Sequence, residues 1–496
     1  MHAYEALEGK FRRLNALREA AGMLHWDMSA MMPKGGAEAR SEQLTALDMT
    51  CHEILKGPEL GELLDRAEQE CDKLDPWRRA NLREMRRTWR HETALPADLV
   101  AALTKAQHKC EMVWREARPA SDFAAVLPRF TELLRLVRES AAAKAAAFGC
   151  SPYAALLDQY EPGGSAARIE AIFADLAAFL PDFLARVLER QAKEPTPILP
   201  PGPFPQAKQE ALARKLMQGV GFDFEYGRLD VSLHPFCGGV PDDVRITTRY
   251  DESDFTTAMM GVLHETGHAM YERGLPPEWR FQLVGAAGGM ALHESQSLLI
   301  EMQACRSPEF IGHMAPLARE TFGGKGPAWD ADNLLRLATR VEPGFIRVDA
   351  DEVTYPAHII LRFRLEQALI AGDLAPADLP GAWNEGMRDL LDLTVKEDRL
   401  GCLQDIHWYD GAFGYFPTYT LGAMTAAQLF SAAKRAVPEI PQAISRGDFA
   451  PLMTWLRANV HGHGALFTTD ELLEKATGKP LDPKVFEAHL KQRYLG

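Results

Sequence analysis

The chain of 496 residues is 46% hydrophobic and carries a formal net charge of -14 at pH 7. This acidic balance argues against binding of nucleic acid or of an anionic membrane surface, because both need clustered Lys and Arg side chains. No run of about 18 consecutive apolar residues predicts a membrane span. A small molecule or a peptide is the expected ligand.

The N-terminus and the cysteines predict a cytoplasmic protein. The first residues are charged and helix-like, without the apolar run and small-residue cleavage site of a secretory signal. The seven cysteines are odd in number and far apart, and none has the spacing of a metal knuckle. We expect reduced thiols that pack as small apolar side chains.

The first two fifths of the chain predict packed helices. Residues 1–50 predict a helical hairpin, with breaks at 25–28 and at 31–36. Residues 38–192 are rich in strong helix formers, and their apolar side chains recur every three or four positions. The proline-rich stretch 194–205 predicts a loop or crossing segment, after which a helix resumes at 206–217.

Residues 226–250 change character, because apolar and polar residues alternate and Val, Ile, Thr and Tyr are frequent. This pattern predicts a sheet of two or three strands, whose exposed edge could bind an extended peptide. Further helices are expected at 255–273, 287–305, 354–371, 379–395 and 421–435. No internal repeat is visible, so residues 1–496 predict one mostly helical domain with a small sheet.

The stretch 261–272 reads GVLHETGHAMYE and contains the pattern of a zinc peptidase. In a helix, His264 and His268 stand one turn apart on the same face and can bind one metal ion, while Glu265 lies beside the open side of that ion. No thiolate is offered here, so imidazole and carboxylate ligands indicate a catalytic site rather than a closed structural one. The pattern also arises by chance in roughly a few per cent of chains of this length, so its neighbours matter.

Glu294 is the predicted third ligand. It lies 26 residues after His268, on the next predicted helix, beyond a glycine-rich turn at 285–289. A third histidine is absent, because Tyr271 and Gly274 occupy the relevant positions. A lone glutamate is more often a surface or capping carboxylate, but beside a paired-histidine helix we expect a ligand. A bound zinc ion would polarise a scissile carbonyl and acidify its water, with Glu265 accepting the proton.

Two later clusters offer further polar groups. Arg347 and Asp351 are four residues apart, close enough to interact in a helix. The stretch that follows Gln404 predicts a glycine-rich loop with His407, Tyr415 and Tyr419 as donors, and donors of this kind can stabilise a tetrahedral oxyanion. Considered singly, each cluster is more often structural than functional.

The chain carries an ordered series of motifs. They are His234-Pro-Phe, Asp243-Val-Arg245-Ile-Thr, His264-Glu-Thr-Gly-His268, His293-Glu-Ser, Ile346-Arg-Val-Asp-Ala-Asp351 and Gly401-Cys-Leu-Gln404-Asp-Ile-His407-Trp. Together they resemble the carboxypeptidase Taq (M32) family of metallocarboxypeptidases. The segment 26–33 resembles the N-terminal region of that family, so the similarity extends over essentially the whole chain.

This resemblance implies an elongated, largely helical fold with a deep cleft, similar to neurolysin and angiotensin-converting enzyme, with an active-site core at about 226–425 and assembly as a homodimer. It implies zinc, replaceable by cobalt (Zn2+ or Co2+), bound by His264, His268 and Glu294, with Glu265 as the general base. Members remove C-terminal residues with broad specificity from peptides that carry a free C-terminal carboxylate, and they usually disfavour proline.

The resemblance also suggests roles for substrate-binding residues. Arg347 would recognise the terminal carboxylate, which a guanidinium satisfies in bidentate fashion. Arg245 would limit how far a peptide extends beyond the cut. His234 and Gln404 are expected among the substrate-binding residues. Tyr419 or His407 would support the oxyanion.

Two other functions remain open at this point. The first is an endo-acting zinc oligopeptidase, which would cleave peptides with an amidated C-terminus as well as free acids. The second is a helical binding or scaffold protein, in which the histidine pair is incidental or binds a structural metal. A structural metal could not be removed without unfolding the chain.

Overall fold

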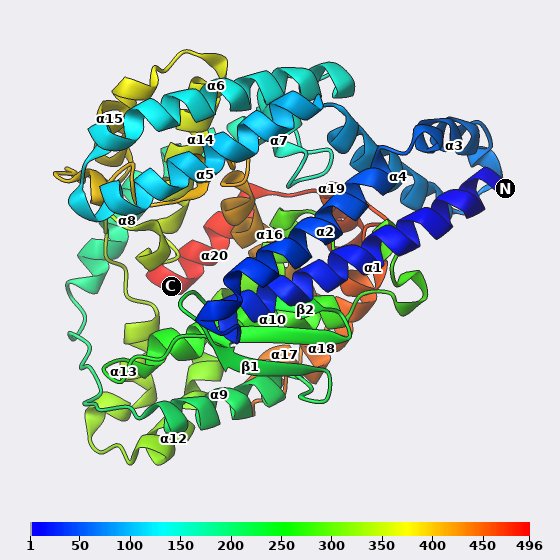
Figure 1. The fold of residues 1–496 in the computed structure, drawn as a ribbon. Helices are drawn as coiled ribbons and strands as arrows, with labels where there is room; N and C mark the ends of the chain where they lie inside the picture. Colours follow the sequence, from blue (N-terminus) through cyan, green and yellow to red (C-terminus); the bar gives the residue numbers. More distant parts are fainter. Residues whose placement is uncertain (1) are drawn as a thin grey trace. The chain divides into compact units, whose positions relative to one another are not determined.

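The computed structural model describes residues 2–496 and confirms a mostly helical chain with one small sheet (Figure 1). The chain divides into two compact units. The first comprises Met1–Trp89, Thr196–Thr339 and Gly422–Asp482, and the second comprises Arg90–Pro195, Arg340–Leu421 and Pro483–Gly496. Among the described residues, no helix is long and apolar enough to cross a membrane.

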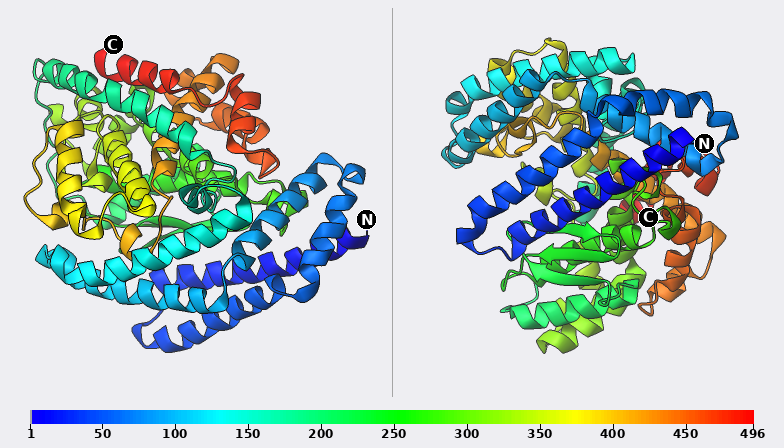
Figure 2. Two further views of the ribbon diagram at one scale, coloured as in Figure 1. Left: turned by 90° about the horizontal axis from the view of Figure 1, so that it is seen from above. Right: turned by 45° about the vertical axis from the view of Figure 1, so that its right-hand side comes forward.

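The first unit opens with a helical hairpin, α1 (His2–Ala30) and α2 (Ala37–Leu55), which run side by side in both views of Figure 2. Helices α3 (Pro58–Gln69) and α4 (Pro76–Thr93) follow, and the last residues of α4 belong to the second unit. The predicted break at 31–36 is confirmed, but the one at 25–28 is wrong. Helix α1 continues through it because Trp26 is buried and packs against the guanidinium groups of Arg228 and Arg245.

The predicted sheet has three strands, β1 (Gly227–Val231), β2 (Phe236–Val240) and β3 (Asp243–Thr248). Their order is β1-β3-β2, with β1 parallel and β2 antiparallel to the central strand. Val244 and Ile246 of β3 are buried in the core that surrounds α10 (Phe255–Arg273), and α9 (Gln206–Val220) packs beside that helix. The sheet therefore packs directly against the helix that carries the histidine pair.

The remaining helical segments of the first unit share an apolar core with α10, and α11 and η5 pack directly against it. They are α11 (Met290–Leu298), the π-helical segment η5 (Leu299–Cys305), α12 (Pro308–Phe322), α13 (Ala331–Ala338), α17 (Ile440–Ile444), α18 (Ala450–Asn459) and α19 (Thr469–Thr477). Val262, Leu263 and Met270 of α10 lie in the same apolar core. Since α10 is buried on several sides, the positions of its histidines are fixed by packing rather than by the helix alone.

The second unit is also built from helices. They are α5 (Ala97–Ala120), α6 (Phe123–Phe148), α7 (Pro152–Leu157), α8 (Ala166–Gln191), α14 (Tyr355–Ala371), α15 (Leu379–Leu391) and α20 (Pro483–Leu495). Helix α16 (Pro417–Ala436) begins in this unit and continues into the first. Two 3-10 turns, η7 (Arg347–Asp349) and η10 (His407–Asp410), carry predicted site residues.

Candidate active site

Helix α10 begins where the sequence predicts and presents both histidines on one face. Asp254 caps its N-terminus by accepting hydrogen bonds from the backbone N–H and the hydroxyl of Thr256. His264 and His268 follow one turn apart, with ring centroids 5.0 Å from each other. Their side chains are 21% and 12% exposed, so a ligand can reach them within an otherwise packed helix.

Gly267 lets α11 approach α10 closely. A Cβ at this position would lie 2.5 Å from the carbonyl oxygen of Gln296 and 2.6 Å from Cα of Ser297, both on α11. Gly422 allows a second close approach, since its Cβ would lie 2.9 Å from the Glu294 side chain. Glycine at 267 and 422 therefore gives Glu294 its place against the histidine helix.

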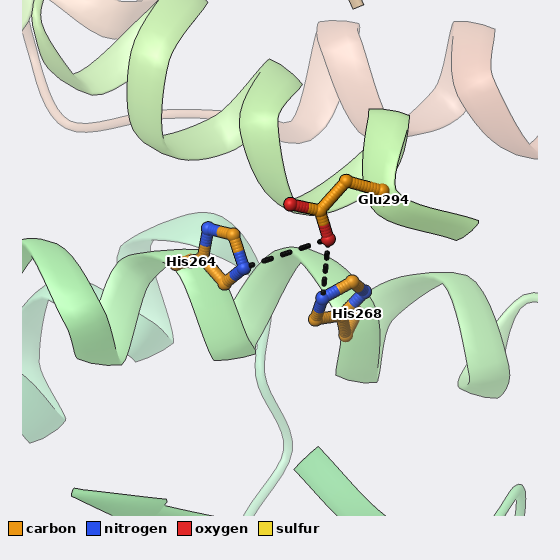
Figure 3. A group of neighbouring side chains, drawn as sticks. All are labelled: His264, His268 and Glu294. Atoms are coloured by element: carbon orange, nitrogen blue, oxygen red, sulfur yellow. Dashed lines mark ion pairs between the residues drawn. The ribbon is translucent and has the colours of Figure 1, made fainter. Parts of the chain in front are cut away.

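The structure brings the three predicted ligands together (Figure 3). The Oε2 atom of Glu294 lies 3.4 Å from Nε2 of His268 and 3.8 Å from Nε2 of His264. Ligand atoms that bind zinc tetrahedrally at about 2.0–2.2 Å lie roughly 3.3 Å from one another. The spacing and the chemistry of these donors therefore fit a metal ion bound by two imidazoles and one carboxylate.

The charges around the triad also favour a cation. Burial lowers the pKa of His264, but Glu294 and Glu301 outweigh it and raise that pKa to about 10. Burial and the neighbouring His293 lower the pKa of His268 to about 4. Burial raises the pKa of Glu294, yet His264 and His268 bring it below its usual value, so the carboxylate stays ionised. A divalent cation would take the place of the proton that His264 otherwise holds.

Glu301, which the sequence analysis did not single out, orients the first histidine. Its Oε2 atom lies 3.0 Å from Nδ1 of His264, so Nδ1–H donates to the carboxylate and Nε2 is left free to bind a metal. The other carboxylate oxygen accepts a 2.8 Å hydrogen bond from Arg306. Glu301 and Arg306 are five residues apart, and the wider turn of the π-helical segment η5 brings such a pair onto one face.

We expect Glu301→Gln to weaken metal binding without unfolding the protein. The amide loses the charge that orients His264 and pairs with Arg306, and loss of such a supporting group typically costs about 10- to 100-fold in metal affinity. Competition with a chromophoric chelator would measure the dissociation constant. Glu19→Gln is the matched control, because this partly buried carboxylate also pairs with an arginine, Arg280, and contacts none of the three ligands. Equal affinities for the two variants would contradict the role of Glu301.

Glu265 has the environment of a general base. It is 7% exposed, and burial raises its pKa to about 7, with Glu294 adding to the rise and His264 opposing it. The backbone N–H of Cys237 on β2 donates to its carboxylate. The sheet therefore helps to hold the carboxylate of Glu265 in place on the helix that carries the ligands His264 and His268.

The structure places Arg245 and His234 at the sheet. Arg245 extends from β3, donates to Asp243 at 2.6 and 3.0 Å, and stacks over Trp26 with a distance of 4.5 Å to the ring centroid. His234 lies exposed in the connection between β1 and β2, and its carbonyl accepts a hydrogen bond from Ser232. Helix α1 thus fixes the guanidinium of Arg245, whereas the His234 side chain faces solvent.

Arg347 lies in the second unit, and its partner differs from the predicted one. The segment is a 3-10 turn rather than a helix, so the predicted pairing of Arg347 with Asp351 is wrong. Arg347 donates to Asp405 at 2.8 and 3.1 Å and to the hydroxyl of Tyr355 at 3.0 Å. The carboxylate of Asp351 instead accepts from the backbone N–H groups of Glu342, Val353 and Thr354.

Asp405 is shared by two arginines. Its Oδ2 atom accepts hydrogen bonds of 2.8 and 2.5 Å from Arg362, which is completely buried. Burial raises the pKa of Asp405, but the two guanidinium groups outweigh it and hold that pKa well below its usual range. Two cations around one carboxylate leave a buried excess of one positive charge, which an anion would compensate.

Gln404 holds the backbone of Arg347 in place. Its Oε1 atom accepts the backbone N–H of Arg347 at 2.9 Å, and its amide nitrogen donates to carbonyl oxygens, including that of Phe345 at 3.0 Å. With its polar atoms engaged in this way, Gln404 is better suited to holding the turn than to contacting a substrate.

The predicted oxyanion donors lie near Arg347. His407 begins the turn η10, while Tyr419 lies in the first turn of α16 and not in the glycine-rich loop. The Arg347 guanidinium is 4.9 Å from the ring centroid of Tyr419, and the Tyr415 and Tyr419 rings meet edge to face at 5.3 Å. Burial, together with Arg347 and Arg362, lowers the pKa of His407 to about 4, so its imidazole is neutral near pH 7.

A family model described as "Carboxypeptidase Taq (M32) metallopeptidase" matches residues 6–494. The chain belongs to this family. Thermostable carboxypeptidase 1 of Thermus thermophilus is 40% identical, with 98% of this chain and 97% of that protein covered. Carboxypeptidase 1 of Bacillus subtilis is 33% identical, with 100% and 98% covered.

Solved structures of the M32 family superimpose on the whole chain. Metallocarboxypeptidase 1 of Trypanosoma cruzi has a TM-score of 0.98 at 43% identity, with both chains covered completely. The Pyrococcus furiosus carboxypeptidase has a TM-score of 0.94 at 32% identity, with 100% and 99% covered. These matches confirm the predicted M32 metallocarboxypeptidase, a hydrolase of peptide bonds, and membership of the family implies a divalent metal.

Sequence reasoning missed three residues, Glu301 beside the metal ligands of the first unit and Asp405 and Arg362 beside Arg347 in the second. Glu301 could have been suspected, because it lies seven residues after Glu294 and so about two helical turns further along the same face. Asp405 stood inside a recognised motif, but nothing in the sequence joins it to Arg347. Arg362 gave no signal, since its role depends on a contact across 43 residues of chain.

Proposed function

We propose that the resident metal is zinc and that His264, His268 and Glu294 bind it, with cobalt able to substitute. The spacing of the three ligand atoms and the absence of a thiolate among them support this assignment. When bound, zinc supplies a Lewis acid that polarises the scissile carbonyl and acidifies a water molecule. Glu265 accepts the proton from that water and passes it to the leaving amine.

We further propose that Arg347 binds the C-terminal carboxylate of the peptide. The observation that carries this proposal is the buried excess of positive charge that Arg347 and Arg362 form around Asp405. Asp405 and Tyr355 engage three of the five N–H donors of Arg347, which leaves others for a second carboxylate. An exopeptidase needs such a group because it must compensate a terminal charge that an internal peptide bond lacks.

A pair of peptides that differ only at the C-terminus would test this proposal. We expect the free acid to lose one residue at a time, a ladder that mass spectrometry resolves, and we expect the C-terminal amide to be cleaved at least about 100-fold more slowly, because a buried charge left without its partner costs several kcal/mol. Arg347→Met should remove most of this preference. Comparable cleavage of both peptides by the unaltered enzyme would instead identify an endo-acting oligopeptidase.

Removal of the metal tests the metal assignment. We expect a chelator to abolish hydrolysis and leave the helical circular dichroism intact, because the site lies within a core that is packed by apolar side chains. Addition of zinc or cobalt should restore activity at one equivalent per chain. Unfolding on chelation would show that the metal is structural.

The other predicted residues have supporting roles in this proposal. Tyr419 or His407 stabilises the oxyanion, with Tyr415 as an alternative donor, and the neutral imidazole of His407 can donate one hydrogen bond. Arg245 and His234 contact the peptide, with Arg245 limiting its length beyond the cut. The resemblance to the M32 family supports these roles, as it supports broad specificity.

We propose that residues 1–496 act as one peptidase domain with its active-site core at about 226–425. The match of the family model over residues 6–494 supports this view. We also propose a homodimer that works in the cytoplasm. The seven cysteines are free in the structure, which fits a reducing compartment.

A further inference from the structure

Helix α20, at the end of the chain, is attached to the short segment that joins the turn η7 to helix α14. The attachment point is Glu352, whose side chain is 4% exposed. Its carboxylate accepts hydrogen bonds from three side chains of α20: His489 at 2.9 Å, Arg493 at 2.9 Å and the hydroxyl of Tyr494 at 3.1 Å. Burial raises the pKa of Glu352, but Arg493 and His489 outweigh it and hold that pKa well below its usual range, so the carboxylate is ionised.

Glu352 lies between Arg347 and a residue that orients its guanidinium. Three residues further on, Tyr355 begins α14 and its hydroxyl accepts the hydrogen bond from Nη1 of Arg347. The carboxylate of the preceding residue, Asp351, accepts hydrogen bonds from the backbone N–H of Glu342, earlier in the chain, and from that of Thr354, later in the chain. Asp351 therefore closes this segment internally, whereas Glu352 fixes it to an element more than 130 residues away in sequence.

We propose that the C-terminal helix is a positioning element for the carboxylate-binding arginine. Glu352, His489, Arg493 and Tyr494 act through Tyr355: they fix the start of α14, and Tyr355 in turn orients the Arg347 guanidinium. This inference rests on the proposed recognition of the peptide's C-terminal carboxylate by Arg347. A bidentate contact demands a fixed guanidinium, so loosening one of its supports weakens binding while the hydrolytic groups are unchanged.

Steady-state kinetics of Arg493→Met on a free-acid peptide test the proposal. We expect KM to rise about fivefold or more and kcat to stay within about twofold. The contact with the terminal carboxylate stabilises the bound substrate and the transition state equally, so its loss weakens binding but does not slow the chemical step. Tyr494→Phe removes a single oxygen and should give a smaller rise of the same kind. It also decides the matter if Arg493→Met fails to fold.

Glu487→Gln is the matched control. Glu487 is another buried carboxylate of α20, but its ion pairs are with Lys484 and Lys491 of the same helix. We expect this variant to keep the KM of the unaltered enzyme. A lower melting temperature with unchanged KM for Arg493→Met, or an equal rise in KM for Glu487→Gln, would reduce α20 to a structural role and overturn the proposal.

A double variant tests the route through Tyr355. In the Tyr355→Phe background, Arg493→Met should raise KM no further, because the hydrogen bond through which α20 acts is already absent. Additive effects would overturn that route. If Arg347→Met leaves the preference for free acids intact, the recognition role itself fails. If Arg347→Met abolishes the preference and the α20 variants leave KM unchanged, only the present inference fails.

Discussion

Glu265→Gln is expected to keep the metal and lose turnover. Glutamine has the same shape and can still accept the backbone N–H of Cys237, so α10 and the three ligands should be unperturbed. It cannot accept a proton from water, and loss of a general base typically costs about 100- to 10,000-fold in rate. We therefore expect kcat to fall by at least about 100-fold while KM changes little. Steady-state kinetics and metal analysis of the same preparation would measure both quantities.

Two comparisons make this result interpretable. Glu278→Gln changes an exposed carboxylate that lies shortly after the same helix, and it should leave kcat unaffected. Metal content should stay at one equivalent per chain in both variants. If Glu265→Gln retained most of its turnover with the metal bound, the proton would have to go to another group, and the assigned role of Glu265 would be wrong.

Gly267→Ala should disrupt the metal site with a single methyl group. The added Cβ would meet backbone atoms of Gln296 and Ser297 at 2.5 and 2.6 Å, and backbone cannot rotate away as a side chain can. Helix α11 must then move, and Glu294 moves with it. Overpacking of this kind costs about 1–3 kcal/mol, so we expect a lower melting temperature and a metal affinity reduced at least about tenfold. Thermal unfolding and chelator competition would measure the two effects.

Gly261→Ala provides the control on the same helix. A Cβ at position 261 would have no heavy atom within 4 Å, so the substitution adds no clash. Replacing glycine by alanine in a helix is worth about 0.5–1 kcal/mol, and we expect unchanged or slightly higher stability with normal metal binding. If Gly267→Ala behaved in the same way, the close packing of α11 on α10 would not be what positions Glu294.

The sequence predicted most of the helices because their signals are local. Helix α10 has the predicted bounds, and the sheet at 226–250 has the alternation that its buried central strand requires. The predicted break at 25–28 was wrong because tertiary packing overrides the local signal. Those four residues include no glycine or proline, and burial of Trp26 beneath two guanidinium groups maintains the helix despite weak helix propensity.

The residues of the candidate site differ in the same way, because some are related by local spacing and others only by tertiary contacts. His264 and His268 are related by helical spacing, and Glu294 follows on the next helix, so sequence pattern was sufficient for these ligands. The partner of Arg347 was not predictable in this way. A helix would have paired it with Asp351, but the chain forms a 3-10 turn, and Asp405 reaches Arg347 from a segment 58 residues further on. Contacts of this kind depend on tertiary packing, which no local pattern encodes.

The π-helical segment η5 makes the length of the chain between Leu299 and Cys305 part of the metal site. A regular helix would cover the same rise with one residue fewer, and neighbouring residues in it are rotated by about 100° from each other. Deleting one residue between Glu301 and Arg306 would leave the two charges four residues apart, a spacing that a regular helix also brings onto one face. Deleting one residue between Glu294 and Glu301 would instead keep both carboxylates but turn Glu301 by about 100° from the face that Glu294 occupies. Sequence changes that conserve every ligand can still inactivate the enzyme if they alter the residue count here.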